Sequence, residues 1–191
     1  MHAVHTVIVG GSAAGLACAK CLKDQSLTDF VILEQAEHIG QKWRNHYERL
    51  HLHTSKQWSQ LPGKSYPVDQ PQYPPRNAVV DYLVEYAREN DLHPQFNTTA
   101  QKIERQSDGL WRVETSQGHY LANYVIMATG MNHKPKMAEF EGFDTTALST
   151  KMVSRLRGSR CWWLVLAIRV VSRRFVCTSM VRRRRCRYAR G

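Results

Sequence analysis

The 191-residue sequence predicts an α/β domain in which a parallel sheet carries a small antiparallel meander. Three observations support this fold class. A strand–helix–strand unit occupies the first 34 residues, polar and apolar residues alternate between positions 102 and 122, and a later apolar strand ends at Gly130. Uninterrupted apolar strands are typical of parallel sheets covered on both faces, whereas alternation is typical of antiparallel strands with one face in water.

The first strand, the helix and the second strand form one compact unit of sequence. Residues 6–9 (TVIV) are short and β-branched, as expected for a strand buried on both faces. Residues 16–22 place their larger apolar side chains on one side of a helix, and residues 29–33 form a second apolar strand. A strand, a helix and a strand within about 30 residues match the size of a βαβ unit.

A glycine-rich turn, GGSAAG at residues 10–15, joins the first strand to the helix. Glu34 follows Gly15 by 19 residues, at the end of the second strand. A buried strand, a glycine turn, a helix and a distant acid together predict a site for an adenine dinucleotide. Ser12 departs from the GxGxxG pattern, but Gly11 can supply conformational freedom and the Ser12 hydroxyl can donate to a phosphate oxygen. The alternative is a glycine turn in an ordinary α/β domain.

The middle of the chain divides into an irregular stretch and a helix. Residues 40–75 are rich in aromatic residues, histidine and proline, and a loop of this length is expected to line a site. A helix is predicted from about residue 78 to residue 89, with Asn77 as its amino-terminal cap. Its predicted buried stripe consists of Val80, Leu83, Val84 and Ala87.

Alternation of polar and apolar residues then predicts a small antiparallel meander with two glycine-containing turns. Its three strands are expected at residues 102–105, 110–115 and 119–122. Residues 124–130 (YVIMATG) return to an uninterrupted apolar pattern. They are predicted to form a further strand of the parallel sheet, buried on both faces.

Several motifs of this chain occur together in one protein family. They are VIVGGSAAGLA, VILEQ, Trp43-Arg44, Tyr47, Leu50, Leu52-His53, Gln72-Tyr73-Pro74, the run GLWRV from Gly109 to Val113, and MATG. As a set, these motifs resemble the flavin-containing monooxygenases, especially those of the plant YUCCA type, over residues 4 to about 145. The stretch from Trp43 to His53 narrows the resemblance, because GGSAAG or ATG alone fits many flavoproteins that bind two dinucleotides.

The resemblance implies a Rossmann-like FAD-binding domain. It also implies a reaction in which NADPH reduces FAD, dioxygen forms a flavin hydroperoxide, and one oxygen passes to a small organic substrate. The cofactor carries this chemistry, so no catalytic side chain is expected. The residues implied to bind the cofactor are Gly10, Gly11, Ser12, Ala13, Ala14 and Gly15 at the diphosphate, Glu34 with its neighbour Gln35 at the ribose, Trp43, Thr54 and Ser55 at the flavin half, and Thr129 and Gly130 closing over the dinucleotide.

Other reactive patterns in the chain have simpler explanations. Cys18 and Cys21 form a CxxC motif, but it lies inside the first helix, past the amino terminus that would lower a thiol pKa, so buried packing is expected. His51 and His53 alternate on one extended face without a third ligand, so no metal site is predicted. Two alternatives remain open: a pyridine-nucleotide disulfide oxidoreductase and a basic-tailed nucleic-acid-binding protein.

Charge and cysteine content separate the chain into two parts. Residues 1–150 contain 14 lysines and arginines against 16 acids, whereas residues 151–191 contain 13 and no acid, which explains the net charge of +11. We therefore predict an incomplete FAD-binding domain at 1–147 and a basic tail at 148–191 that is disordered or non-native. Five scattered cysteines favour a reducing compartment, the cytoplasm, and the longest apolar run is too short to span a membrane.

The tail has the composition of codons translated in the wrong frame. Tryptophan has the single codon TGG. When the last base of each codon is joined to the first two bases of the following codon, Trp162-Trp163 gives GTG, which encodes valine. Synonymous choices across residues 157–172 permit GKPVLVVGAGNSGGE, which contains a strand and a GxGxxG motif. This peptide would be the NADPH-binding fingerprint that the resemblance places after the ATG strand. We therefore predict a frameshift, no NADPH site in frame, and an inactive chain that binds no nucleic acid.

Overall fold

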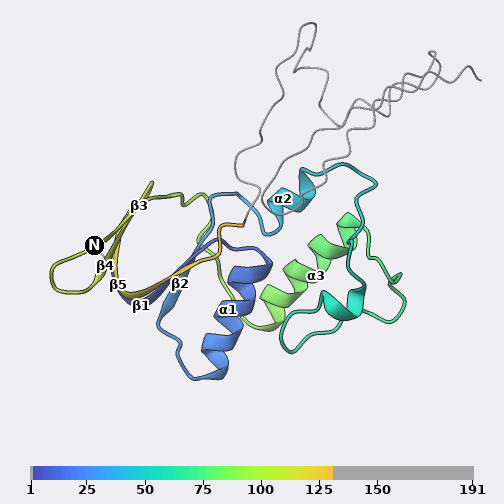
Figure 1. Cartoon of the computed structure of the whole chain (residues 1–191), viewed down its shortest axis with the longest axis horizontal. Coiled ribbons are helices and arrows are strands. Elements are labelled where there is room, and N and C mark those ends of the chain that lie inside the picture. The colour runs from blue at the N-terminus through green and yellow to red at the C-terminus, as the bar shows by residue number, and fades with distance from the viewer. Residues whose placement is uncertain (1, 131–191) are drawn as a thin grey trace, which may run out of the picture. The chain divides into compact units, whose positions relative to one another are not determined.

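The computed structural model describes residues 2–130, and its elements confirm a mixed α/β fold (Figure 1). The predicted tail at 148–191 lies outside the described residues. The strands are β1 (His2–Val9), β2 (Phe30–Leu33), β3 (Ala100–Arg105), β4 (Trp111–Thr115) and β5 (Gly118–Met127). The helices are α1 (Ala13–Asp24), α2 (Gln41–Arg44) and α3 (Arg76–Glu89), with a 3-10 turn at Lys56–Trp58.

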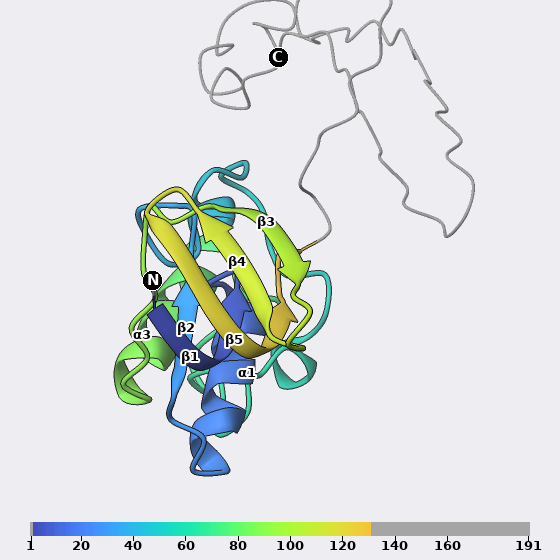
Figure 2. The same ribbon diagram turned by 90° about the vertical axis from the view of Figure 1, so that its left-hand side faces the viewer.

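One five-stranded sheet, in the order β2-β1-β5-β4-β3, organises the domain. β1 lies parallel to both β2 and β5, and β4 lies antiparallel to both β3 and β5 (Figure 2). The expected division between a meander strand at 119–122 and a parallel strand at 124–130 is wrong, because β5 is one ten-residue strand. It pairs with β1 as far as Met127, whereas β4 pairs only with its first half, up to Ala122.

The first parallel strand is buried on both faces, as predicted for residues 6–9. Ile8 packs in one apolar cluster with Leu16 of α1 and with side chains of α3. Val7 packs in a second cluster with Val113 of β4. Figure 1 shows α1 and α3 on one side of β1 and β2, and the meander strands on the other. The helices and the meander therefore cover opposite faces of the parallel strands.

The second half of β5 is more exposed than its sequence predicts. Tyr124 and Met127 each have 60% of their surface accessible, so the expectation of a strand buried on both faces is wrong here. Past Ala122, β5 pairs with β1 alone among residues 2–130. The apolar residues of this half therefore line a strand that has one described neighbour, β1, and no described neighbour at its other edge.

Helix α3 begins at Arg76, and the residue before it, Pro75, has no capping side chain, so the predicted cap at Asn77 is wrong. The buried residues of α3 are Val79, Val80, Tyr82, Leu83, Tyr86 and Ala87. Val84, which was expected in the buried stripe, is 39% exposed. The buried side of the helix is turned toward its tyrosines because α3 also packs against the segment of residues 40–75, here named the excursion.

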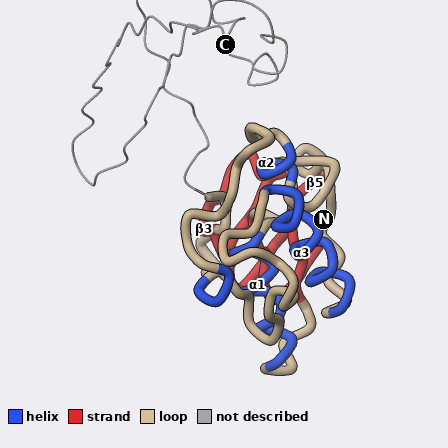
Figure 3. The backbone as a smooth tube through the Cα atoms, turned by 90° about the vertical axis from the view of Figure 1, so that its right-hand side faces the viewer, coloured by secondary structure: helices blue, strands red, loops and turns tan. Residues whose placement is uncertain are grey.

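Tyrosine hydroxyls attach the excursion to α3, and most of it is loop (Figure 3). Tyr82 accepts a hydrogen bond from Leu61 N–H and donates one to the Lys64 carbonyl, each at 2.7 Å. Tyr86 donates to the Pro62 carbonyl at 2.8 Å. Burial raises the pKa of Tyr86 to about 12, so its hydroxyl stays protonated and remains a donor into alkaline pH. The excursion is therefore anchored along α3 by side-chain hydrogen bonds.

Leu83→Ala should lower the free energy of unfolding by about 2–5 kcal/mol, because it leaves a cavity at a buried position of α3. Val84→Ala, one residue further along the same helix, should cost about 0.5 kcal/mol or less, since Val84 is partly exposed. Urea unfolding followed by circular dichroism measures both variants. Equal costs would contradict the buried side of α3 described above.

Candidate dinucleotide-binding site

Backbone segments meet closely at the carboxyl ends of β1 and β5, and glycine is required there twice. Gly10 has a φ of +114°, and a Cβ on it would lie 2.4 Å from the Ala128 carbonyl oxygen. A Cβ on Gly15 would lie 1.8 Å from the Gly10 carbonyl oxygen. No side chain can be accommodated at these distances. The two glycines therefore allow α1 to start against β1 and place the end of β5 beside the turn.

The amino terminus of α1 has hydrogen-bond donors without partners in the helix. Ser12 is its cap residue, but the Ser12 side chain makes no capping hydrogen bond. The first helical bond runs from Leu16 N–H to the Ser12 carbonyl, so the N–H groups of residues 13–15 are left over. The first turn contains no acidic residue. Free N–H groups, an unused hydroxyl and the positive end of the helix dipole suit an anionic diphosphate.

Glu34 is held just past β2 through both of its carboxylate oxygens. Gly11 N–H donates to Oε2 at 2.8 Å, and Ala36 N–H donates to Oε1 at 3.0 Å. Each carboxylate oxygen can accept more than one hydrogen bond, so Glu34 can still accept from two ribose hydroxyls. The bond from Gly11 joins the glycine turn directly to the acid, and the two parts of the predicted motif are therefore neighbours.

The end of β5 meets α2 as well as the glycine turn. Thr129 and Gly130 follow β5, and the preceding residue, Ala128, adjoins Gly10. Lys42 of α2 places its Nζ atom 3.5 Å from the Thr129 carbonyl oxygen. The predicted cofactor residues did not include Lys42, because its short helix carries no motif that indicates this contact. Only the fold brings its ammonium group to the rim of the turn.

Besides Thr129 and Gly130, four further predicted cofactor residues have no described hydrogen bond to the turn. Trp43 is partly buried against the apolar cluster of α1 and α3. The Thr54 hydroxyl bonds within its own loop, and Ser55 precedes the 3-10 turn of the excursion. Gln35 is exposed. Their roles at the flavin half and the ribose stay predictions.

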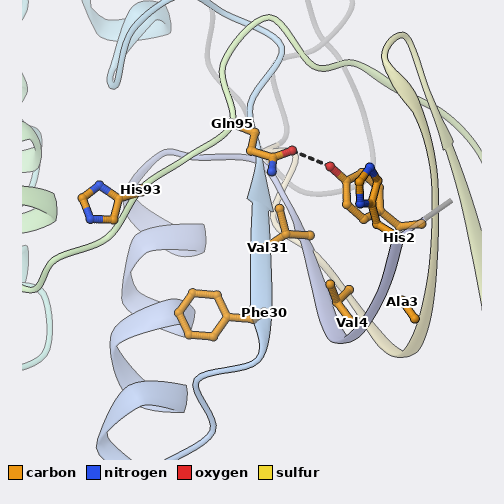
Figure 4. Close-up of a pocket in the computed structure, with 8 residues that line it drawn as sticks. His2, Ala3, Val4, Phe30, Val31, His93 and Gln95 are labelled. Atoms are coloured by element: carbon orange, nitrogen blue, oxygen red, sulfur yellow. Dashed lines mark hydrogen bonds between the residues drawn. The ribbon is translucent and has the colours of Figure 1, made fainter.

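The described residues also contain a hollow and two cysteines. The hollow, lined by His2, Phe30 and Gln95, extends along β2 (Figure 4). The Gln95 carbonyl accepts a hydrogen bond from Glu34 N–H, so one end of the hollow adjoins the candidate site. Cys18 packs partly against the apolar cluster, but Cys21 is exposed, so buried packing was the wrong expectation for Cys21. Within residues 2–130, no group of three potential metal ligands occurs, and no helix is long and apolar enough to cross a bilayer.

Comparisons of sequence and of structure with known proteins both point to flavoprotein oxidoreductases. Residues 7–159 match the pyridine nucleotide-disulphide oxidoreductase family. The chain is 40% identical over 147 residues to the indole-3-pyruvate monooxygenase YUCCA6 of Arabidopsis thaliana, which covers 74% of this chain and 35% of that protein. The flavin-containing monooxygenase from Stenotrophomonas maltophilia matches in structure with a TM-score of 0.66 and 31% identity, over 74% of this chain and 43% of that one.

A third similarity concerns the fold alone. The bacillithiol disulfide reductase from Staphylococcus aureus matches with a TM-score of 0.68 at 21% identity, over 76% of this chain and 44% of that one. The predicted resemblance to YUCCA-like flavin monooxygenases and the predicted fold class are therefore confirmed. The matched region spans about a third (35%) of the length of YUCCA6.

Glu34→Ala should leave the purified protein without the yellow colour of bound FAD, because it removes the predicted ribose acceptor and the partner of Gly11 N–H. Glu34→Gln keeps the size of the side chain and one acceptor oxygen, so it should retain part of the FAD. Flavin absorbance per mole of folded protein, with folding checked by circular dichroism, measures the occupancy. Full occupancy in Glu34→Ala would remove Glu34 from the cofactor site.

Proposed function

We propose that this chain, which belongs to the pyridine nucleotide-disulphide oxidoreductase family, is the FAD-binding part of an NADPH-dependent flavin monooxygenase acting on a small organic molecule. The observation that carries the proposal is the hydrogen bond from Gly11 N–H to the Glu34 carboxylate, beside the amino terminus of α1. It brings the N–H donors for a diphosphate beside the carboxylate acceptor for the ribose hydroxyls, as the adenosine half of FAD requires. The sequence similarity to flavin monooxygenases supports the reaction class.

FAD, when bound, would supply the redox chemistry, taking electrons from NADPH and delivering oxygen from dioxygen to the substrate. The residues of this chain would bind and orient the cofactor. The N–H groups of residues 13–15 and the Ser12 hydroxyl would hold the diphosphate, and Glu34 would hold the ribose. We assign Trp43 and Thr54-Ser55 to the flavin half on the family resemblance.

The NADPH-binding unit is proposed to lie in the shifted reading frame. The family match ends at residue 159, close to residue 157, where the shifted-frame peptide begins. In the same region, from residue 151 onward, all charged residues of the sequence are basic. We therefore propose that the chain has a frameshifted tail, no NADPH site of its own and no monooxygenase turnover. A cytoplasmic location, inferred from the cysteine content, is part of the same proposal.

The alternative of a disulfide oxidoreductase receives less support from the site. Cys18 and Cys21 lie in the second and third turns of α1, beyond the N–H groups that would lower a thiol pKa. The bacillithiol disulfide reductase is 21% identical, and this similarity shows a shared fold but no shared reaction. The nucleic-acid alternative depends on the tail at 148–191, outside the described residues.

The purified full chain should retain FAD through gel filtration, and the double variant Cys18→Ser/Cys21→Ser should retain the same amount. NADPH should leave the flavin oxidised, because the unit that would present the nicotinamide is absent from the frame. Visible absorbance under anaerobic conditions measures both properties. Protein that never binds FAD refutes the proposed function. Reduction of an added disulfide by NADPH that is lost in the double cysteine variant favours the disulfide oxidoreductase.

The gene should encode GKPVLVVGAGNSGGE in the shifted frame across codons 157–172, because the tail would then be the NADPH-binding unit translated out of register. Sequencing codons 140–191 and the downstream region tests this directly. As an internal control, the same shift applied to codons 6–34 should give no dinucleotide fingerprint. Third bases that do not permit the peptide would contradict the frameshift.

A further inference from the structure

Helix α2 carries a positive charge and a hydrogen-bond acceptor that the described residues leave unpaired. Lys42 forms no ion pair with any carboxylate of residues 2–130. The other lysines in this range have partners: Lys20, Lys23, Lys64 and Lys102 pair with acids, and Lys56 donates to three carbonyl oxygens. Beside Lys42, the Gln41 Oε1 atom is buried without a donor. Among the lysines of residues 2–130, Lys42 is therefore the one held by a single weak contact.

The ammonium group of Lys42 lies at the rim of the candidate site. Its Nζ atom is 3.5 Å from the Thr129 carbonyl oxygen and 3.9 Å from the position of a Cβ on Gly130. The preceding carbonyl, that of Ala128, adjoins Gly10 in the glycine turn. A contact of 3.5 Å is a weak hydrogen bond, so the ammonium keeps its donors for a closer partner.

Charge balance indicates what that partner is. The diphosphate of a dinucleotide carries two negative charges, whereas the amino terminus of α1 offers about half a positive charge. Glu34 adds a negative charge beside the same turn, and the first turn of α1 has no basic residue. A cation from another element would therefore strengthen the binding of an anion in this turn, and Lys42 lies at the end of β5, beside Thr129 and Gly130.

We propose that Lys42 binds the FAD diphosphate and neutralises part of its charge, an inference that rests on the proposed function. The role is separate from the glycine turn and Glu34, because it comes from α2 and acts through charge. Lys42 is a binding residue in this assignment and takes no part in the chemistry of the flavin.

The test compares Lys42→Met with the wild-type full chain, using two probes that share the adenosine diphosphate, FAD and ADP-ribose. Lys42→Met should weaken both about tenfold, the usual scale for one charge-assisted hydrogen bond. It should also reduce the dependence of both dissociation constants on salt, because one screened attraction is lost. Lys42→Arg should restore most of the affinity. Lys102→Met, an exposed lysine of β3, should change neither. Flavin fluorescence measures FAD, and titration calorimetry measures ADP-ribose.

The outcomes separate this inference from the proposed function. Equal weakening of FAD and ADP-ribose, restored by arginine, supports the diphosphate contact. Weakening of FAD alone overturns it, because the charge would then act on the flavin half. Unchanged affinities in Lys42→Met, with the wild type binding FAD, overturn the inference and leave the proposed function standing. A wild type that binds neither probe overturns both.

Discussion

The close approach of α1 to β1 is the constraint on which the rest of this site depends. A Cβ on Gly15 would stand 1.8 Å from the Gly10 carbonyl oxygen, so the helix can begin where it does only because both residues lack side chains. The first N–H groups of α1 are thereby presented at the end of the sheet. The same geometry brings Gly11 N–H to the Glu34 carboxylate. One backbone arrangement thus produces both polar features of the candidate site.

Two long-range connections bring further elements to this turn. β5 pairs with β1 and, through its first half, with β4, so the meander and the end of the parallel sheet belong to one strand. At the other side, Gly40 begins α2 against α3, where a Cβ on it would lie 3.6 Å from Val80. The tyrosines of α3 hold the chain that follows α2. Lys42 therefore reaches the end of β5 from an element that is packed in place.

The sequence predicted the βαβ unit, the glycine turn and Glu34 because their signals are local and lie within the first 34 residues. The wrong expectations share a non-local cause. Burial of residues 124–127 depends on a partner for the strand edge, which the strand itself does not encode. Exposure of Val84 depends on where the excursion packs against α3. Lys42 contacts a residue 87 positions away, and no local pattern could indicate it.

The candidate dinucleotide site lies in a part of the chain where the sheet has an unpaired edge. The turn, Glu34 and Lys42 all lie within residues 2–130, whereas the edge of β5 beyond Ala122 has no described partner and leaves Tyr124 and Met127 exposed. Unpaired strand edges favour further pairing. We therefore expect cofactor affinity and the stability of the sheet to depend on different regions of the chain. Binding of FAD to the candidate site can consequently be assessed independently of turnover.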